Sequence, residues 1–134
     1  MFEKRRLQRN VNGINVEFEE LDIFEKCEFE SRYSDFSVIQ KKYQDIRMEE
    51  IEKGENKGKL KVRDVPEEQK EELAEIRKKH IELFVKIFEV PKLFVNGEKV
   101  ENLSLFLGRI GVVSGIAFYY EIMTAGGLED EEGK

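Results

Sequence analysis

Hydrophobic and polar residues alternate next to two Asn-Gly pairs, and this pattern predicts two β-hairpins. Ile14, Val16 and Phe18 alternate with polar neighbours, which is the period of a half-buried strand. The Asn-Gly pair at 12–13 supplies the two positive-φ residues of a type I′ turn. Residues 93–100, LFVNGEKV, carry the same turn signal. The sequence therefore predicts a small antiparallel sheet built from Asn-Gly hairpins.

A further strand is predicted at residues 27–33, followed by a helix. Every second residue of this stretch falls on one face, and these residues are Cys27, Phe29, Ser31 and Tyr33. Cys27 is accordingly expected to be a small buried apolar residue. Ser34 or Asp35 is expected to cap the helix, because short polar side chains accept hydrogen bonds from a first helical turn. One side of that helix carries Phe36, Ile39, Tyr43 and Ile46.

Apolar residues three and four apart predict a long, highly charged helix from about residue 67 to residue 89. Its main stripe consists of Leu73, Ile76, Leu83 or Phe84, and Ile87. Pro66 suits a first helical turn, and Pro91 stops the helix. Before this helix, residues 54–58 are expected to form a flexible loop and residues 59–65 a short exposed strand.

The C-terminal region begins with a segment that differs from the rest of the chain, since residues 108–120, GRIGVVSGIAFYY, contain one charge. A last helix is predicted here, with Asn102 or Ser104 as its cap and a break near Gly108. Residues 126–134 have the composition of an acidic tail.

Three glycines, Gly108, Gly111 and Gly115, are spaced three and four apart in this last helix. Each costs roughly 1 kcal/mol relative to alanine in a helix interior, so close approach of another element is expected along their ridge. The opposite face carries Val113, Ile116, Ala117 and Tyr120. Two interpretations stay open: the helix is the core of its own chain, or one side faces another subunit. In the second case the interface anchors are Phe118, Tyr119 and Tyr120.

Together with the chain length and composition, these elements predict a single α+β domain over residues 1–125, in which two or three helices cover the sheet. Lys and Glu dominate the 39% of charged residues, a balance that is typical of a thermophile proteome or of an AT-rich genome and describes the source rather than the function. Arg109 and Glu121 interrupt the apolar C-terminal stretch, so no membrane span is expected. The single Cys27 fits a reducing compartment. We therefore expect a cytoplasmic protein that has no contact with a membrane.

No residue pattern indicates catalysis. His80 is the sole histidine, which excludes a histidine-based triad or a multi-histidine metal site within one chain, and a place at the edge of the core is expected for it. Cys27 lies between Glu25 and Glu28, which do not provide the electropositive setting of a reactive thiol. Residues 54–59, GENKGK, have too few residues between the glycines for a phosphate-binding loop. We expect no catalytic, cofactor-binding or metal-binding residue and no small-molecule substrate.

Two clusters of basic residues are candidates for contact with phosphate or with an acidic partner. They consist of Lys4, Arg5, Arg6 and Arg9, and of Lys57, Lys59, Lys61 and Arg63. Neither cluster is interleaved with aromatic residues in the manner of a base-stacking surface, and the net charge of −6 disfavours general nucleic-acid binding. Docking onto the acidic tail of a neighbouring subunit is the more natural use.

The order of features from about Glu71 to Ala125, under half of the chain, resembles one group of proteins. The three segments that carry the resemblance are EELAEIRKKHIELFVKIFEV, PKLFVNGEKVENLSLFLGRI and GVVSGIAFYYEIMTAGG. Their layout of charged helix, short turn and apolar helix is similar to the tail-assembly chaperones and minor tail proteins of tailed phages. The resemblance implies a non-enzymatic, self-associating protein that binds other phage structural proteins, and hence a place in the virion as an alternative to the cytoplasm.

The expected function is accordingly protein–protein interaction, as a homo-oligomeric structural or assembly component without a cofactor. The alternative is an accessory protein that binds nucleic acid through the two basic clusters.

Overall fold

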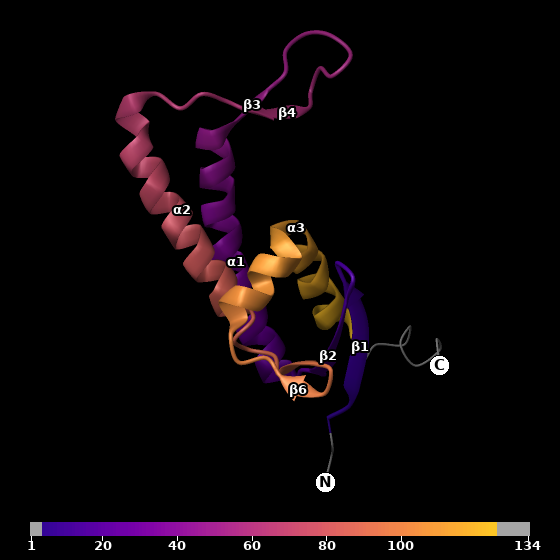
Figure 1. The fold of residues 1–134 in the computed structure, drawn as a ribbon. Coiled ribbons are helices and arrows are strands. Elements are labelled where there is room, and N and C mark those ends of the chain that lie inside the picture. The colour runs from indigo at the N-terminus through magenta and orange to yellow at the C-terminus, as the bar shows by residue number, and fades with distance from the viewer. Residues whose placement is uncertain (1–3, 126–134) are drawn as a thin grey trace. The chain divides into compact units, whose positions relative to one another are not determined.

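The computed structural model describes residues 4–125, which form an α+β protein, as predicted. These residues divide into two compact units: a sheet unit of residues 4–31 and 85–125, and a hairpin unit of residues 32–84. The elements in chain order are β1 (Arg6–Val11), β2 (Ile14–Glu19), α1 (Ile23–Arg47), β3 (Met48–Glu50), β4 (Leu60–Val62), α2 (Glu67–Ile87), β5 (Leu93–Val95), β6 (Glu98–Lys99) and α3 (Leu103–Thr124) (Figure 1). Helices α1 and α2 each run from one unit into the other. The tail predicted at 126–134 lies outside the described residues.

The sheet unit contains an antiparallel sheet with the strand order β1-β2-β5-β6. Both of its hairpins turn at an Asn-Gly pair, as the sequence predicts. Asn12 and Gly13 have φ values of 49° and 86°, and Asn96 and Gly97 have values of 54° and 80°. Asparagine and glycine tolerate this left-handed conformation, which a type I′ turn requires at both central residues.

Helix α1 begins with a capping box. The Asp22 side chain accepts a hydrogen bond from the backbone N–H of Glu25 (2.8 Å), and the Glu25 carboxylate accepts one from the N–H of Asp22 (3.1 Å). This reciprocal pair satisfies donors that a helix leaves open at its first turn. The strand expected at 27–33 is therefore wrong, because these residues continue the helix. The caps expected at Ser34 or Asp35 are wrong for the same reason, since both lie in mid-helix.

Helical geometry also changes the place of Cys27. In a strand it would share a face with Phe29, whereas in a helix the two side chains point about 200° apart. Phe29 is fully buried and Cys27 is exposed, so the expectation of a buried cysteine is wrong.

The core of the sheet unit is an aromatic cluster supplied by four different elements or connections. Phe118 of α3 meets Phe18 of β2 edge to face, with 5.7 Å between the ring centroids, and stacks on Phe88 at 5.9 Å. Phe29 meets Phe88 at 6.1 Å and Tyr119 at 4.7 Å. Aromatic side chains bury large areas, and edge-to-face pairs add favourable quadrupole contacts. This cluster joins the sheet to the helices of the unit.

The hairpin unit consists of antiparallel parts of α1 and α2 with the β3–β4 pair at their far end (Figure 1). Helix α2 and the exposed strand β4 confirm the sequence predictions, while β3 was not predicted. His80 of α2 is buried between two rings of α1, with centroid distances of 4.8 Å to Phe36 and 5.4 Å to Tyr43. Its Nε2 lies 2.8 Å from the amide oxygen of Gln40, which can only accept a hydrogen bond. His80 therefore joins the two helices.

Helix α3 is capped by Asn102, whose side chain accepts a hydrogen bond from the N–H of Leu105 (3.0 Å). The helix bends at Gly111, where φ is 83° and ψ is 167°, so the predicted break lies three residues beyond Gly108. Asn12, at the tip of the first β-hairpin, donates from its side-chain amide to the carbonyl oxygens of Arg109 (3.5 Å) and Ile110 (3.2 Å). The same asparagine thus serves the β-turn and the carbonyl groups beside the bend.

Candidate functional site

The interface candidates on α3 divide into buried and exposed residues. Phe118 and Tyr119 are 1% and 4% exposed, and both belong to the aromatic core. Gly115 is also buried, whereas Tyr120 is 54% exposed. Of the three proposed aromatic anchors, Tyr120 is the exposed one, and its ring meets that of Tyr119 edge to face.

The three glycines do not form a continuous helical ridge, because the bend at Gly111 separates Gly108 from Gly115. Gly111 adopts a backbone conformation that L-residues rarely reach, which explains glycine there without any close contact. A Cβ atom at Gly108 would meet no atom within 4 Å. The close approach expected along the glycine ridge is therefore absent at both Gly108 and Gly111.

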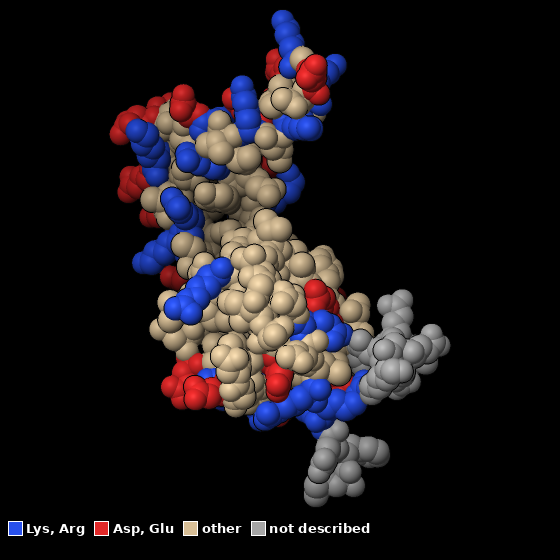
Figure 2. All heavy atoms as spheres, turned by 45° about the vertical axis from the view of Figure 1, so that its right-hand side comes forward, with Lys and Arg blue, Asp and Glu red and all other residues tan. Residues whose placement is uncertain are grey.

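An apolar stripe is exposed on the second half of α3, opposite the core-facing side. Val113 is 84% exposed, and Ala117 and Tyr120 follow it at helical spacings of four and three residues. The half-buried Ile116 lies beside them. We call Val113, Ile116, Ala117 and Tyr120 the α3 surface. In Figure 2 a broad uncharged area covers the part of the sheet unit that contains α3. The sequence predicted that these four residues share one face of the helix. It left open whether this face belongs to the core or contacts another subunit, and in the structure the face is exposed to solvent.

Charged groups border the α3 surface. Glu121, next to Tyr120, pairs with Arg9 of β1 at 3.5 Å. Behind the surface, burial and the nearby carboxylate of Glu30 raise the pKa of Tyr119, so its phenol stays neutral. The surface thus combines an apolar centre with a charged edge, which is the usual anatomy of a protein interface.

By length and composition alone, α3 could cross a membrane, and a third (33%) of its most apolar window is buried within the protein. A core helix passes the same test, so the test does not separate the two kinds of helix. The expectation of no membrane span stays a prediction.

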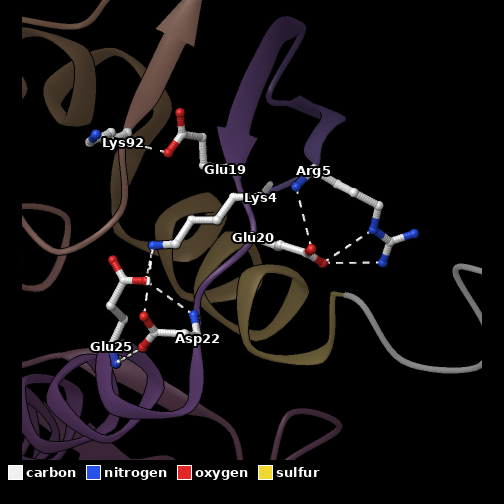
Figure 3. A network of polar contacts seen from close by, with 7 residues as sticks. All are labelled: Lys4, Arg5, Glu19, Glu20, Asp22, Glu25 and Lys92. Carbon is white, nitrogen blue, oxygen red and sulfur yellow. Dashed lines mark hydrogen bonds and ion pairs between the residues drawn. The ribbon is translucent and has the colours of Figure 1, made fainter. Parts of the chain in front are cut away.

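The first basic cluster is largely engaged in contacts within the sheet unit. Lys4 contacts the carboxylate of Glu25, and Arg5 binds Glu20 through its side chain (3.2 Å to Nη2) and its backbone N–H (Figure 3). Arg6 lies over the ring of Phe94 at 3.9 Å, in cation–π geometry. With Arg9 paired to α3, each of the four basic residues has a partner in the described part of the chain.

These contacts shift the pKa values of the groups involved. The hydrogen bond to Glu25 raises the pKa of Lys4, which keeps the ammonium charged. Partial burial favours the neutral form of Glu20, but the hydrogen bonds from Arg5 outweigh it and lower the pKa of this carboxyl. The backbone N–H of Glu25 is the main cause that lowers the pKa of Asp22. Lys4, Glu20 and Asp22 are therefore charged at neutral pH. The contacts of Figure 3 tie the residues just before β1 to the start of α1.

The second basic cluster lies on the β3–β4 pair and the segment after it. Lys61 pairs with Glu49 across the two strands (3.4 Å), and Arg63 donates to the side chain of Gln69 (2.6 Å). Lys57 and Lys59 are exposed in the connection between the strands. The two clusters belong to different units, the first to the sheet unit and the second to the hairpin unit.

Among the described residues, no three His, Cys, Asp or Glu side chains gather in a way that could hold a metal ion. Burial lowers the pKa of His80, so the imidazole of this residue is neutral at pH 7. No family model, no curated protein and no solved structure matches the chain.

Proposed function

We propose that this chain is a non-enzymatic interaction module that self-associates through the α3 surface, as a structural or assembly component. The observation that supports the proposal is the exposed stripe around Val113 and Tyr120 on a helix that carries few charges. Contiguous apolar patches that remain in water on a folded protein commonly mark a site of contact with a protein or a membrane. A tyrosine at the edge of such a stripe is a frequent hot-spot residue.

A role in a particle with repeated subunits agrees with the resemblance of residues 71–125 to phage tail proteins. Self-association on a two-fold axis would place the α3 surface against its own copy, so that one apolar stripe supplies both sides of the contact. The paired charges of the 4–9 cluster weigh against the alternative of nucleic-acid binding, because arginine and lysine side chains that already bind carboxylates neutralise fewer phosphates.

The test is the association constant of the full chain and of the variant Val113→Glu, measured by sedimentation velocity over a range of concentrations. Because Val113 is 84% exposed, a charge there leaves the monomer fold intact but must be desolvated in the contact. We expect association to weaken by roughly tenfold or more. Val62→Glu is the matched control, since Val62 of β4 is 59% exposed and lies in the other unit.

The proposal fails if the association constants of the wild-type chain and Val113→Glu agree within error. It also fails if the wild-type chain is monomeric at every concentration. Flotation of that monomer with liposomes would then assign the apolar stripe to a lipid surface.

A further inference from the structure

A groove of about 510 Å³ runs between α1 and α2 within the hairpin unit. Three half-buried isoleucines, Ile39, Ile46 and Ile76, form its apolar floor. Its charged rim consists of Lys42, Asp45, Glu72, Glu75 and Lys79. The groove is independent of the α3 surface, which belongs to the sheet unit.

The charges on the rim are separated by sign along the groove. Gln40 and His80 lie opposite each other because their side chains are hydrogen-bonded, and this contact fixes the register of the antiparallel helices. At 1.5 Å per residue, Asp45 and Glu75 both lie about 7.5 Å from this level, toward the β3–β4 end. Lys42 and Lys79 lie about 3 Å and about 1.5 Å from it on the same helices. The groove therefore has an acidic end near β3–β4 and a basic end near His80.

The hairpin unit also leaves apolar groups incompletely covered. Among its residues, all of which the structure describes, Phe36, His80 and Phe84 are the buried side chains. Val38 is 58% exposed and lies on the same side of α1 as Lys42, one turn before it. A pair of helices with so few buried side chains gains burial when two further helices cover its open face.

The geometry points to a second copy of this chain as the occupant of the groove, with the two hairpin units related by a two-fold axis perpendicular to their helices. In this arrangement α1 packs antiparallel against α1 of the second copy, and α2 against α2. The acidic end of each groove then lies over the basic end of the other, and the isoleucine floors meet at the centre. The result is a four-helix bundle in which a single charge pattern complements itself.

Charge complementarity favours a second copy over a partner of one sign. A uniformly acidic or basic helix would be attracted at one end of the groove and repelled at the other. The two-fold arrangement brings opposite signs together at both ends. Parallel alignment, with both β3–β4 ends together, would instead place Glu75 level with Asp45 of the other copy, so the pattern also selects the antiparallel orientation.

The experiment uses two full-length variants in a Val113→Glu background, which blocks the α3 surface so that the groove is tested alone. Lys42→Glu/Lys79→Glu makes the whole rim acidic, and Glu72→Lys/Glu75→Lys makes it mostly basic. Each variant alone opposes like charges, so we expect its self-association to be about tenfold weaker than that of the parent. When the two are mixed, an acidic groove faces a basic one, and association returns to at least the strength of the parent.

Recovery on mixing cannot arise from contacts within one chain, because those contacts stay altered in each variant. Sedimentation velocity measures the association, and circular dichroism checks that each variant keeps its helices. Glu71→Lys and Lys78→Glu, on α2 but outside the groove, are the matched controls and should leave association unchanged. The inference is overturned if the mixture associates no more strongly than either variant alone, or if the Val113→Glu parent stays monomeric. Neither result bears on the α3 surface, because Val113→Glu tests that surface in the otherwise unaltered chain.

Discussion

His80 illustrates how one residue can hold two helices together while remaining uncharged. Its ring stacks nearly parallel to Tyr43 (5°) and at 22° to Phe36, and its Nε2 hydrogen-bonds Gln40. Burial lowers its pKa below the ordinary value of 6.5, because a charged imidazole would lose its hydration there. The sequence placed this histidine at the edge of the core, which the structure confirms, but the partner residues on α1 could not be found from the sequence.

The pH dependence of stability follows from that shift. The unfolded chain binds a proton on His80 at about pH 6.5, whereas the folded chain binds it only at lower pH. The stabilisation from the neutral imidazole is thus complete above pH 6.5 and is lost as the pH falls toward the folded-state pKa. We expect the free energy of unfolding, measured with urea, to decrease between about pH 7.5 and about pH 5.5.

The variant His80→Phe keeps an aromatic ring between Phe36 and Tyr43 but cannot titrate. Its free energy of unfolding should change less than that of the wild type over the same pH range. Because His80 is the sole histidine, equal slopes for the two proteins would show that its protonation is not coupled to folding.

At the scale of elements, α3 departs most from a regular helix. Its backbone departs from helical φ and ψ at Gly111, and the Asn12 side chain of the first β-turn donates to the carbonyl oxygens of Arg109 and Ile110 beside this bend. In the second half of the helix, after the bend, Phe118 is buried in the aromatic core, whereas Val113 on the opposite side remains in water.

Two glycine substitutions separate backbone conformation from packing in α3. Gly111→Ala should lower the free energy of unfolding by about 1–3 kcal/mol, because φ of +83° is unfavourable for a residue with a Cβ atom. Gly108→Ala should leave it unchanged or raise it by up to about 1 kcal/mol, because Gly108 is helical, exposed and free of neighbours at the Cβ position. Urea unfolding of both variants is the measurement. A Gly111→Ala protein as stable as Gly108→Ala would contradict the bend.

The elements that the sequence predicted correctly are those with strong local signals. The Asn-Gly turns are determined by the two residues themselves, and α2 has a long periodic pattern bounded by prolines. The residues at 27–33 fit both the period of a strand and the period of a helix, since Phe29 and Tyr33 are four residues apart and also belong to the alternating set. Only the contact of Phe29 with Phe88 and Tyr119, from distant parts of the chain, makes the helical period the effective one. The Asp22–Glu25 capping box was the local signal that could have indicated the helix.

For the whole molecule, the main feature is the unequal distribution of buried side chains between the two units. Among the described residues, the hairpin unit buries three side chains, and all the other buried residues, including the aromatic cluster, belong to the sheet unit. Local opening follows the density of buried contacts, so the hairpin unit should open more readily.

Hydrogen exchange at low micromolar concentration measures this difference. We expect backbone amides at 41–47 and 68–76 to exchange faster than those at 115–122 of α3, although all three stretches are helical. The connection between β3 and β4 should exchange fastest. Equal protection of all three helical stretches would mean that the two units open together.

The candidate site could be predicted in part at this scale. The sequence identified the α3 face that carries Val113 and Tyr120. It also proposed Phe118 and Tyr119 as interface anchors, but both are buried in the aromatic core. It could not indicate that the basic residues at 4–9 pair with Glu20, Glu25 and Glu121, because these partners come from other elements. The separation of charges along the groove of the hairpin unit could not be predicted either. It depends on the register between α1 and α2, and no local sequence pattern determines that register.

The hydrogen bonds from Asn12 to α3 have a consequence for the chemical ageing of the protein. An asparagine followed by glycine loses its side-chain ammonia readily, because the unhindered glycine N–H can attack the side-chain carbonyl. The attack at Asn12 forms a succinimide, and water then opens this ring to isoaspartate or aspartate. Either product carries a carboxylate, which only accepts hydrogen bonds and would face the carbonyl oxygens of Arg109 and Ile110. During long storage, a reaction in the first β-turn would therefore remove the hydrogen bonds that support the bend of α3, a helix that lies about 100 residues away along the sequence.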